Sequence, residues 1–368
     1  MAKPENIEEI IAAVEKTYGE NVIHKSSEFQ RILRIPFDSI ELNVATGGGV
    51  PVGRWSRFWG GESSGKTTNA LKVIKNAQNI HIIAEQMLLC DYEPIREEAE
   101  RILEKFPDGM TCCYYNIEKS FDKVHAENIG VDTDKLWLVE ASEIEKVGEI
   151  LEASLGAFNL HVVDSVSAAV PLEAMEADIT DWQRGLNARV WNKVLDHVEE
   201  KVEESENAII LIDQVRQNMF TGGETVSGGK RLGHVSSLTI HFKRGKDLYM
   251  TSSGALKPEK PKNADTLSGE AEPVGFEMLA HVKKSRVGTA QRKANMQYEY
   301  SKRGVNRYSE LAKASYWLGF VEVSGSWFTL PNGEKVQGVG KLIDAIKEDT
   351  KIQKQIQDKI YQYYYENP

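Results

Sequence analysis

The sequence has few cysteines and no long apolar segment, and both features narrow the class of protein. The three cysteines among 368 residues, Cys90, Cys112 and Cys113, form no CxxC pair and are too few for a disulfide framework. No apolar run reaches the roughly 18 residues that a transmembrane helix needs, and residues 1–5 carry no apolar signal region. We therefore expect a cytoplasmic protein that makes no contact with a membrane.

Basic residues are also in the minority, with 45 Lys and Arg against 55 Asp and Glu, for a net charge of −10. This balance alone argues against nucleic acid as a partner. However, residues 215–246 carry six basic side chains and one acidic one, and residues 283–303 carry seven and one. Such tracts can bind the phosphates of a nucleotide or of DNA. On charge alone, a solvated surface is the better interpretation of both tracts.

Residues 60–67 read GGESSGKT, which fits the G-x-x-x-x-G-K-[ST] pattern of a phosphate-binding loop. Glycines permit backbone angles that other residues avoid, so successive N–H groups can surround a phosphate at the start of a helix. Lys66 can reach the β- and γ-phosphate oxygens, and the Thr67 hydroxyl can bind Mg²⁺. A strand predicted at 54–59 and a helix at 68–74 supply the expected context. The motif residues are Gly60, Gly61, Glu62, Ser63, Ser64, Gly65, Lys66 and Thr67.

Two carboxylates follow predicted strands. The strand predicted at 160–164 ends in Asp164, where a carboxylate can hold Mg²⁺ through water. Many strands end in aspartate, so this signal depends on its pairing with the phosphate loop. Glu118 follows a strand predicted at 111–117 and is the best-placed carboxylate to orient or deprotonate an attacking water. A surface ion pair is the alternative that its position leaves open.

A third strand, predicted at 208–213, is followed by Gln214, which could sense a γ-phosphate and pass the signal onward. The segment 215–229 contains four glycines and is too long for a minimal connector, which is typical of a functional or mobile loop. A second such loop spans 173–181.

The pattern of apolar residues predicts an α/β fold with a mixed, mostly parallel sheet. Strands predicted at 235–242, 276–282 and 294–300 follow one another through loops and suggest an antiparallel edge. An amphipathic helix is predicted at 6–18, with Asn6 as its cap. We interpret 1–33 as an oligomerisation arm, 34–310 as the core with a surface insertion at about 80–110, and 311–368 as a small C-terminal α/β domain. We expect the segment up to the glycine-rich turn at 47–53 to dock outside the main core as well.

These motifs, in this order, resemble the bacterial RecA recombinase family over residues 7–362. The resemblance implies a RecA-like P-loop ATPase core, with ATP and Mg²⁺ as cofactors. The matching segments are 60–68 (GGESSGKTT), 161–167 (HVVDSVS), 185–189 (GLNAR), 213–216 (DQVR), 228–229 (GG), 130–132 (GVD) and 325–328 (GSWF).

The resemblance implies roles for individual residues. Lys66, Thr67 and Thr68 would bind ATP, Asp164 would support Mg²⁺, Glu118 would activate water, and Gln214 would couple the γ-phosphate to a DNA-binding loop. Asp122 and His125 lie where the family contacts adenine, with His125 in place of a phenol, and Tyr300 belongs to the expected ATP-binding set. Lys284 and Arg286 match two family lysines that reach the ATP of a neighbouring subunit, although the extra Lys283 leaves this alignment open by one residue. The expected DNA-binding residues are Arg184, Arg189, Arg216, Met219, Gly228, Gly229 and Lys230.

The implied activity is an ATP-dependent recombinase that forms a helical filament on single-stranded DNA, pairs it with homologous duplex DNA and exchanges strands. Loader or single-strand-binding proteins are further partners to consider. Arg184 in place of a methionine, the acidic insertion and the lack of an acidic C-terminal tail favour a phage-encoded or divergent bacterial member. A ring helicase or DNA-translocating motor would share Lys66, Glu118 and Asp164, but the N-terminal helix fits a filament arm better. A non-catalytic scaffold for repressor cleavage is a third alternative, against which Glu118 argues.

Overall fold

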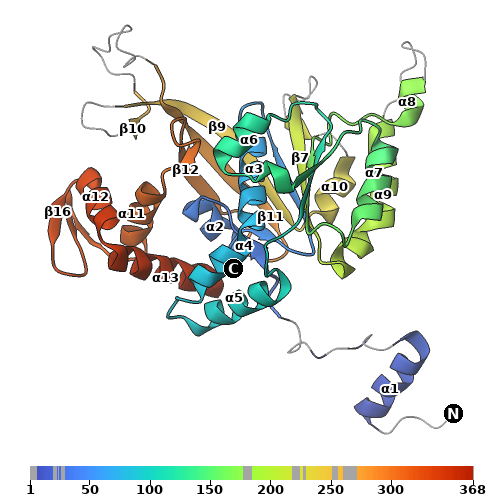
Figure 1. Cartoon of the computed structure of the whole chain (residues 1–368), viewed down its shortest axis with the longest axis horizontal. Helices are drawn as coiled ribbons and strands as arrows, with labels where there is room; N and C mark the ends of the chain where they lie inside the picture. Colours follow the sequence, from blue (N-terminus) through green and yellow to red (C-terminus); the bar gives the residue numbers. More distant parts are fainter. Residues whose placement is uncertain are drawn as a thin grey trace. The chain divides into compact units, whose positions relative to one another are not determined.

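The computed structural model describes residues 6–19, 23, 25, 30–176, 185–217, 224–226, 229–250, 256–259 and 272–367 (Figure 1). The chain divides by its contacts into two units, 1–32 and 33–368. The first unit contains α1 (Ile7–Tyr18), which begins at the predicted cap: the Asn6 side chain accepts a hydrogen bond of 2.8 Å from the N–H of Glu9. None of the side chains of α1 is buried. Of the helices among the described residues, none is long and apolar enough to cross a membrane.

The second unit is built on a large mixed sheet with the strand order β13-β12-β11-β9-β3-β7-β6-β4-β5. From β9 to β5, neighbouring strands are parallel, whereas β11, β12 and β13 continue the sheet in antiparallel pairs. The antiparallel edge of β9, β11 and β12 was predicted, although β9 begins at Leu238 rather than at residue 235, and β13 was not predicted. The strand bounds are β3 (Trp55–Gly60), β4 (Cys112–Asn116), β5 (Leu136–Val139), β6 (Leu160–Asp164), β7 (Ala208–Gln217), β9 (Leu238–Met250), β11 (Gly275–Ser285), β12 (Lys293–Glu299) and β13 (Gly304–Val305), with β8 (Glu224–Val226) on β7 and β10 (Leu256–Lys257) on β9.

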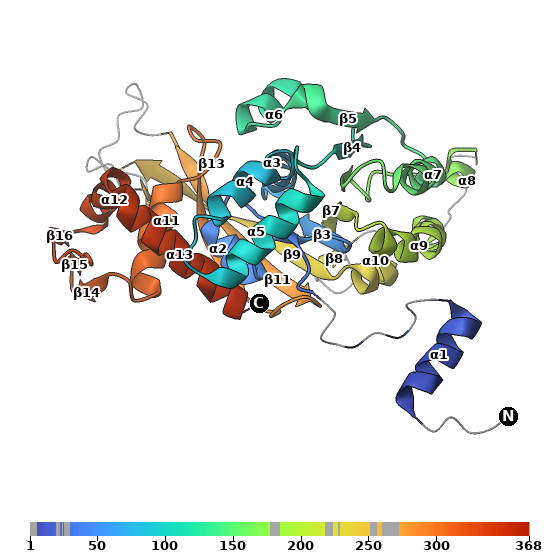
Figure 2. The ribbon, with the colours of Figure 1, turned by 60° about the horizontal axis from the view of Figure 1, so that its bottom comes forward.

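Successive side chains of the central strands point to opposite faces of the sheet, and each face has its own apolar cluster. Along β6, Val162 belongs to one cluster and Val163 to the other. Both faces are buried because helices cover each of them, which explains the nearly continuous apolar runs of these strands (Figure 2). The first face is covered by α3 (Lys66–Gln78), α4 (Ile80–Met87), α5 (Glu93–Lys105) and α6 (Lys123–Ile129), and the second by α7 (Ile144–Ser154), α9 (Leu186–Glu204) and α10 (Gly229–Val235). The short α8 (Leu172–Glu176) precedes α9.

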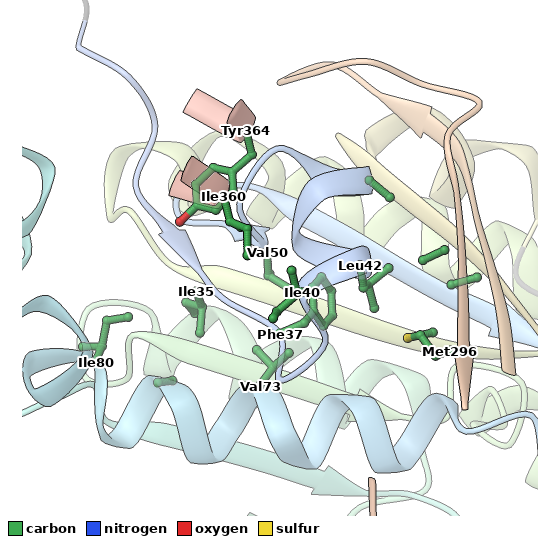
Figure 3. Close-up of a cluster of buried hydrophobic side chains, with 14 of the residues drawn as sticks. Ile35, Phe37, Ile40, Leu42, Val50, Val73, Ile80, Met296, Ile360 and Tyr364 are labelled. Atoms are coloured by element: carbon green, nitrogen blue, oxygen red, sulfur yellow. The ribbon is translucent and has the colours of Figure 1, made fainter. Parts of the chain in front are cut away.

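The segment expected to dock outside the core instead forms part of it. Helix α2 (Ile40–Thr46) follows β1 (Arg34–Ile35) and precedes β2 (Val50–Pro51), and it buries Ile40 and Leu42. These side chains lie in the same cluster as Val73 of α3 (Figure 3). The expectation was wrong because residues 40–46, which precede a turn-rich segment, form a seven-residue helix that buries most of its apolar side chains.

The insertion is likewise less superficial than predicted. Its amphipathic helix is present as α5, but α4 precedes it and was not predicted. Ile95, Ala99 and Ile102 of α5 are buried in the main cluster, and Tyr92 meets Tyr365 of the C-terminal helix edge to face, with ring centroids 5.7 Å apart. The exposed side chains of the helix are charged and mostly acidic, so composition suggested a surface segment.

The predicted glycine-rich loop after Gln214 begins later than expected. Strand β7 does not end at Asp213 but continues to Gln217 and pairs in an antiparallel register with β8, from Val215 opposite Val226 to Gln217 opposite Glu224. Residues 214–217 contain a single apolar side chain, Val215, and so offered no apolar run from which a strand could be predicted.

The C-terminal part contains the predicted small α/β arrangement, and α13 carries Ile352, Ile356 and Ile360 on its buried face. These residues join the main cluster together with Tyr364 (Figure 3). The elements are α11 (Arg307–Trp317), β14 (Glu322–Ser324), β15 (Trp327–Thr329), β16 (Lys335–Gln337), α12 (Val339–Glu348) and α13 (Thr350–Glu366).

Candidate nucleotide-binding site

The predicted phosphate loop joins β3 to α3, as its sequence context indicated. At two of its glycines, neighbouring atoms leave no room for a side chain. A Cβ on Gly60 would lie 2.1 Å from the carbonyl oxygen of Phe242, and one on Gly65 would lie 2.3 Å from the methyl carbon of Met278. Gly65 also has a left-handed backbone (φ 91°) and begins α3 without a side-chain cap. The N-terminal N–H groups of α3 therefore remain available to an anion.

Lys66 occupies the first turn of α3 and folds back over the loop. Its ammonium donates hydrogen bonds of 3.0 Å to the carbonyl of Gly60 and 2.6 Å to that of Gly61. Burial lowers the pKa of Lys66, and the carboxylates of Asp164 and Glu118 oppose this shift. The neighbouring carboxylates thus offset only part of the cost of burying the Lys66 ammonium.

Asp164 ends β6 directly beside the start of α3. One of its oxygens accepts hydrogen bonds from the Thr67 hydroxyl at 2.8 Å and from the Tyr114 hydroxyl at 2.7 Å. Only 3% of Asp164 is exposed, and burial raises the pKa of its carboxyl although both hydrogen bonds act in the other direction. The structure therefore brings together the two residues predicted to support Mg²⁺.

Glu118 lies just beyond β4, at the same edge of the sheet. One of its oxygens accepts a short hydrogen bond from the Ser165 hydroxyl and a second, of 2.7 Å, from the side-chain amide of Gln214. Glu118 itself is exposed. Because β4, β6 and β7 are parallel neighbours, Glu118, Ser165 and Gln214 lie side by side where β4 and β6 end and the parallel pairing of β7 ends. Glu118 and Gln214 are thus in direct contact, as a coupled pair requires.

These residues fit a nucleoside triphosphate with its metal ion. Lys66 and Asp164 are both buried, and burial disfavours the charged form of each, so neither fully compensates the other. A polyanion beside Lys66 and a divalent cation beside Thr67 and Asp164 would restore that balance. Among the residues that the structure describes, no group of three or more His, Cys, Asp or Glu side chains could hold a metal ion unaided. Magnesium would therefore depend on phosphate oxygens for much of its coordination.

The residues expected near adenine are less closely assembled. Asp122 caps α6 and accepts a hydrogen bond of 3.0 Å from the N–H of His125, so its side chain has a structural role in the first place. Tyr300 follows β12, is 42% exposed, and accepts a hydrogen bond of 3.0 Å from Arg244. Among the described residues, no hydrogen bond or ring contact joins Tyr300 to Asp122 or His125.

The two residues expected to act on a neighbouring subunit differ in their surroundings. Lys284 donates hydrogen bonds of 2.7 Å to the carbonyls of Gly233 and of His234 at the end of α10. The Arg286 side chain is exposed. The extra Lys283 lies at a bulge in β11, where the register with β9 shifts between Val282 and Lys284.

Four of the seven expected DNA-binding residues lie among the described residues. Arg189 is exposed in the first turn of α9, Arg216 lies in β7, and Gly229 and Lys230 begin α10. Arg184, Met219 and Gly228 lie outside the described residues. The structure thus gives a backbone position in the fold for Arg189, Arg216, Gly229 and Lys230.

Sequence reasoning missed Tyr114 and Ser165. Tyr114 is one of two adjacent tyrosines on β4, and only the pairing of Asn116 with Asp164 reveals that its side chain shares a face with the Asp164 carboxyl. Ser165 could have been suspected because it directly follows Asp164. The fold and the site together define a P-loop nucleotide-binding protein with an α/β core.

Comparisons with known proteins make this class specific. A family model described as RecA N-terminal domain matches residues 5–91 and 99–305. Protein RecA of Haemophilus ducreyi is 30% identical over 370 residues, covering 97% of this chain and 86% of that protein. Protein RecA of Mannheimia haemolytica is 29% identical over 378 residues, covering 99% and 89%. The crystal structure of the RadB recombinase aligns with 72% of this chain and 95% of that chain, at 18% sequence identity and a TM-score of 0.45. This structural similarity is too low to support a conclusion about the chain.

The chain therefore belongs to the RecA family. Membership identifies it as a RecA-family recombinase and implies ATP binding and an ATPase. Residues 92–98, at the start of α5, fall outside the family match, so the beginning of this helix is a departure from the family pattern.

Proposed function

We propose that this protein is a DNA-dependent ATPase that polymerises on single-stranded DNA, pairs it with homologous duplex DNA and exchanges strands. The observation that carries the proposal is the 2.7 Å hydrogen bond from Gln214 to Glu118. Gln214 lies in β7, the strand that leads into the segment expected to bind DNA, and Glu118 is the carboxylate expected to act on water. This contact supports a direct link between the state of the nucleotide and the position of the DNA-binding segment.

In this proposal the triphosphate site is built by α3 and the strand ends. The loop 60–65 and Lys66 bind the phosphates, while Thr67 and Asp164 hold Mg²⁺. Bound MgATP supplies the phosphoanhydride bond that is cleaved. Glu118 orients and deprotonates the water, and Ser165 and Gln214 hold the Glu118 carboxylate in place through their hydrogen bonds.

Assembly into a filament would use the N-terminal arm, residues 1–33. Helix α1 exposes apolar side chains that its own unit does not cover, with Ile7 75% and Tyr18 74% exposed. A helix with an apolar face is stable only when another surface covers that face. We assign the covering surface to a second copy of the chain, and we place the protein in the cytoplasm, where single-stranded DNA and ATP are available.

The proposal is tested by strand exchange between a circular single strand and a homologous linear duplex, with ATP, with ADP and without nucleotide. We expect joint molecules with ATP alone, and electron microscopy with single-stranded DNA and a non-hydrolysable analogue should show helical filaments. Closed rings, together with ATP-driven unwinding of a forked duplex and no exchange, would instead support a translocating motor.

A further inference from the structure

The C-terminal end of α10 is held by a lysine side chain of strand β11. The last carbonyl groups of a helix lack intrahelical partners, and in α10 two of them, those of Gly233 and His234, each accept a hydrogen bond of 2.7 Å from the Lys284 ammonium. A cation at this position also interacts favourably with the negative end of the helix dipole. Lys284 thus binds the end of α10 by a two-point, charge-assisted contact.

The contact depends on the bulge in β11. Val282 pairs with Ile240 and Lys284 with Thr239, so Lys283 is the additional residue in this strand. The bulge turns the lysine after it out of the regular alternation. As a result, Lys284 is half-buried against α10, whereas Lys283 is exposed. The two adjacent lysines therefore differ in environment although they share the same charge.

Helix α10 connects two regions of the proposed mechanism. One is the segment 215–229, which is expected to bind DNA, and the other is the nucleotide edge, the edge of the sheet that carries Lys66, Glu118 and Asp164. The helix begins at Gly229, at the exit of that segment. Its other end adjoins Arg57, since a Cβ on Gly233 would lie 3.5 Å from the guanidinium. Arg57 forms a buried ion pair with Asp213 of β7. The next residue along β7 is Gln214, which contacts Glu118.

We propose that Lys284 is a positioning residue that, within its own subunit, holds the end of α10 and so restrains the exit of the DNA-binding segment before nucleotide binds. The functional part of this inference rests on the proposed function. Two of the three N–H donors of the Lys284 ammonium are used on α10, so a phosphate outside its subunit would compete with the carbonyls of Gly233 and His234 for this cation. A weaker contact would loosen the restraint on the end of α10 and on the segment that leads into it.

Hydrogen exchange on the full-length protein without nucleotide or DNA tests the positioning role. Lys284→Met keeps the aliphatic stem and removes the ammonium, and we expect the amides at the end of α10 to exchange roughly tenfold faster, as for loss of a charge-assisted hydrogen bond. Lys284→Arg should restore most of the protection, and Lys283→Met, the matched control, should leave it unchanged. Equal exchange in Lys284→Met and the unaltered protein would overturn the inference.

A second measurement separates positioning from a purely structural contribution. We expect Lys284→Met to raise the affinity for a fluorescent oligo-dT several-fold in the absence of nucleotide, which reduces the ratio of affinities with and without a non-hydrolysable ATP analogue. An unchanged ratio would contradict the restraint of the DNA-binding segment. If the protein bound no DNA at all, the proposed function would fail, whereas the exchange result on α10 would stand independently.

Discussion

Two regions of the molecule each contain a buried carboxylate with different surroundings. One is Asp164 at the nucleotide edge, and the other is Glu310 at the joint where α11 packs against α2. Asp164 accepts hydrogen bonds from Thr67 and Tyr114. Glu310 of α11 accepts one of 2.7 Å from the Ser39 hydroxyl and one of 2.5 Å from the N–H of Ile40, at the start of α2. Burial raises the pKa of both carboxyls.

The difference lies in what surrounds each group. Asp164 shares its edge of the sheet with Lys66 and with the exposed Glu118, so an incoming ligand can complete the charge balance. Glu310 is 6% exposed and its hydrogen bonds go to the segment that it packs against, which makes it an internal link between α11 and α2. A perturbed pKa alone therefore does not identify a catalytic group; the accessible neighbouring charges do.

The largest expected effect at the nucleotide edge comes from Glu118→Gln. The amide retains the shape of the side chain and loses the base, so DNA-stimulated ATP hydrolysis should fall by about 100- to 10,000-fold while ATP and DNA binding remain. Steady-state phosphate release measures the hydrolysis, and filter binding measures the affinities for ATP and DNA. Glu140→Gln is the matched control, because Glu140 follows β5 as Glu118 follows β4. Undiminished turnover in Glu118→Gln would remove this residue from its role.

At the joint, the expected effect is on stability and depends on pH. Burial raises the pKa of Glu310 from its ordinary value of 4.5 to about 7. A carboxyl with a raised pKa stabilises the fold most at pH values below about 4.5, and this contribution is lost as the pH rises to about 7, by about 3 kcal/mol. Denaturant unfolding at pH 5 and pH 8 should therefore show a smaller pH difference in Glu310→Gln than in the unaltered protein.

The amide of Glu310→Gln can accept from Ile40 and donate to Ser39, so the hydrogen bonds are preserved without a titrating group. Glu322→Gln, at an exposed position of β14, is the control and should leave the pH dependence unchanged. The same pH dependence in Glu310→Gln as in the unaltered protein would show that Glu310 does not titrate in this range.

The smallest of these effects is expected for Tyr114→Phe, which sharpens the comparison because it removes one of the two donors to Asp164. The Tyr114 hydrogen bond lowers the pKa of Asp164, so its loss should favour the protonated carboxyl. We expect a roughly tenfold weaker affinity for MgATP, equivalent to about 1.5 kcal/mol, and a greater loss at pH 6 than at pH 8. Isothermal titration calorimetry measures both.

Tyr115→Phe is the control for this substitution. The Tyr115 hydroxyl lies on the opposite face of the sheet, 3.2 Å from Ser154 and 3.2 Å from the Nδ1 atom of His161. Equal losses in the two variants would indicate a general effect on β4 rather than a specific one on Asp164.

Much of the candidate site could be predicted because its parts are local in the sequence. The phosphate loop, its flanking strand and helix, and the strand ending in Asp164 all depend on short-range spacing. The strand through Gln214 was predicted too short because its last residues are mostly polar and pair with β8, a contact that the local sequence does not reveal. The burial of α2 and α5 could not be predicted, because it depends on surfaces supplied by distant segments such as α13.

By itself, the amino-acid sequence determined the α/β class, the phosphate loop and the family resemblance, since glycine spacing and apolar periodicity act over a few residues. Only the tertiary structure decided that Gln214 meets Glu118, that Tyr114 supports Asp164 and that Lys284 is directed to α10. Each of these contacts joins residues far apart in the chain, and each follows from strand order and register, which a single sequence does not specify.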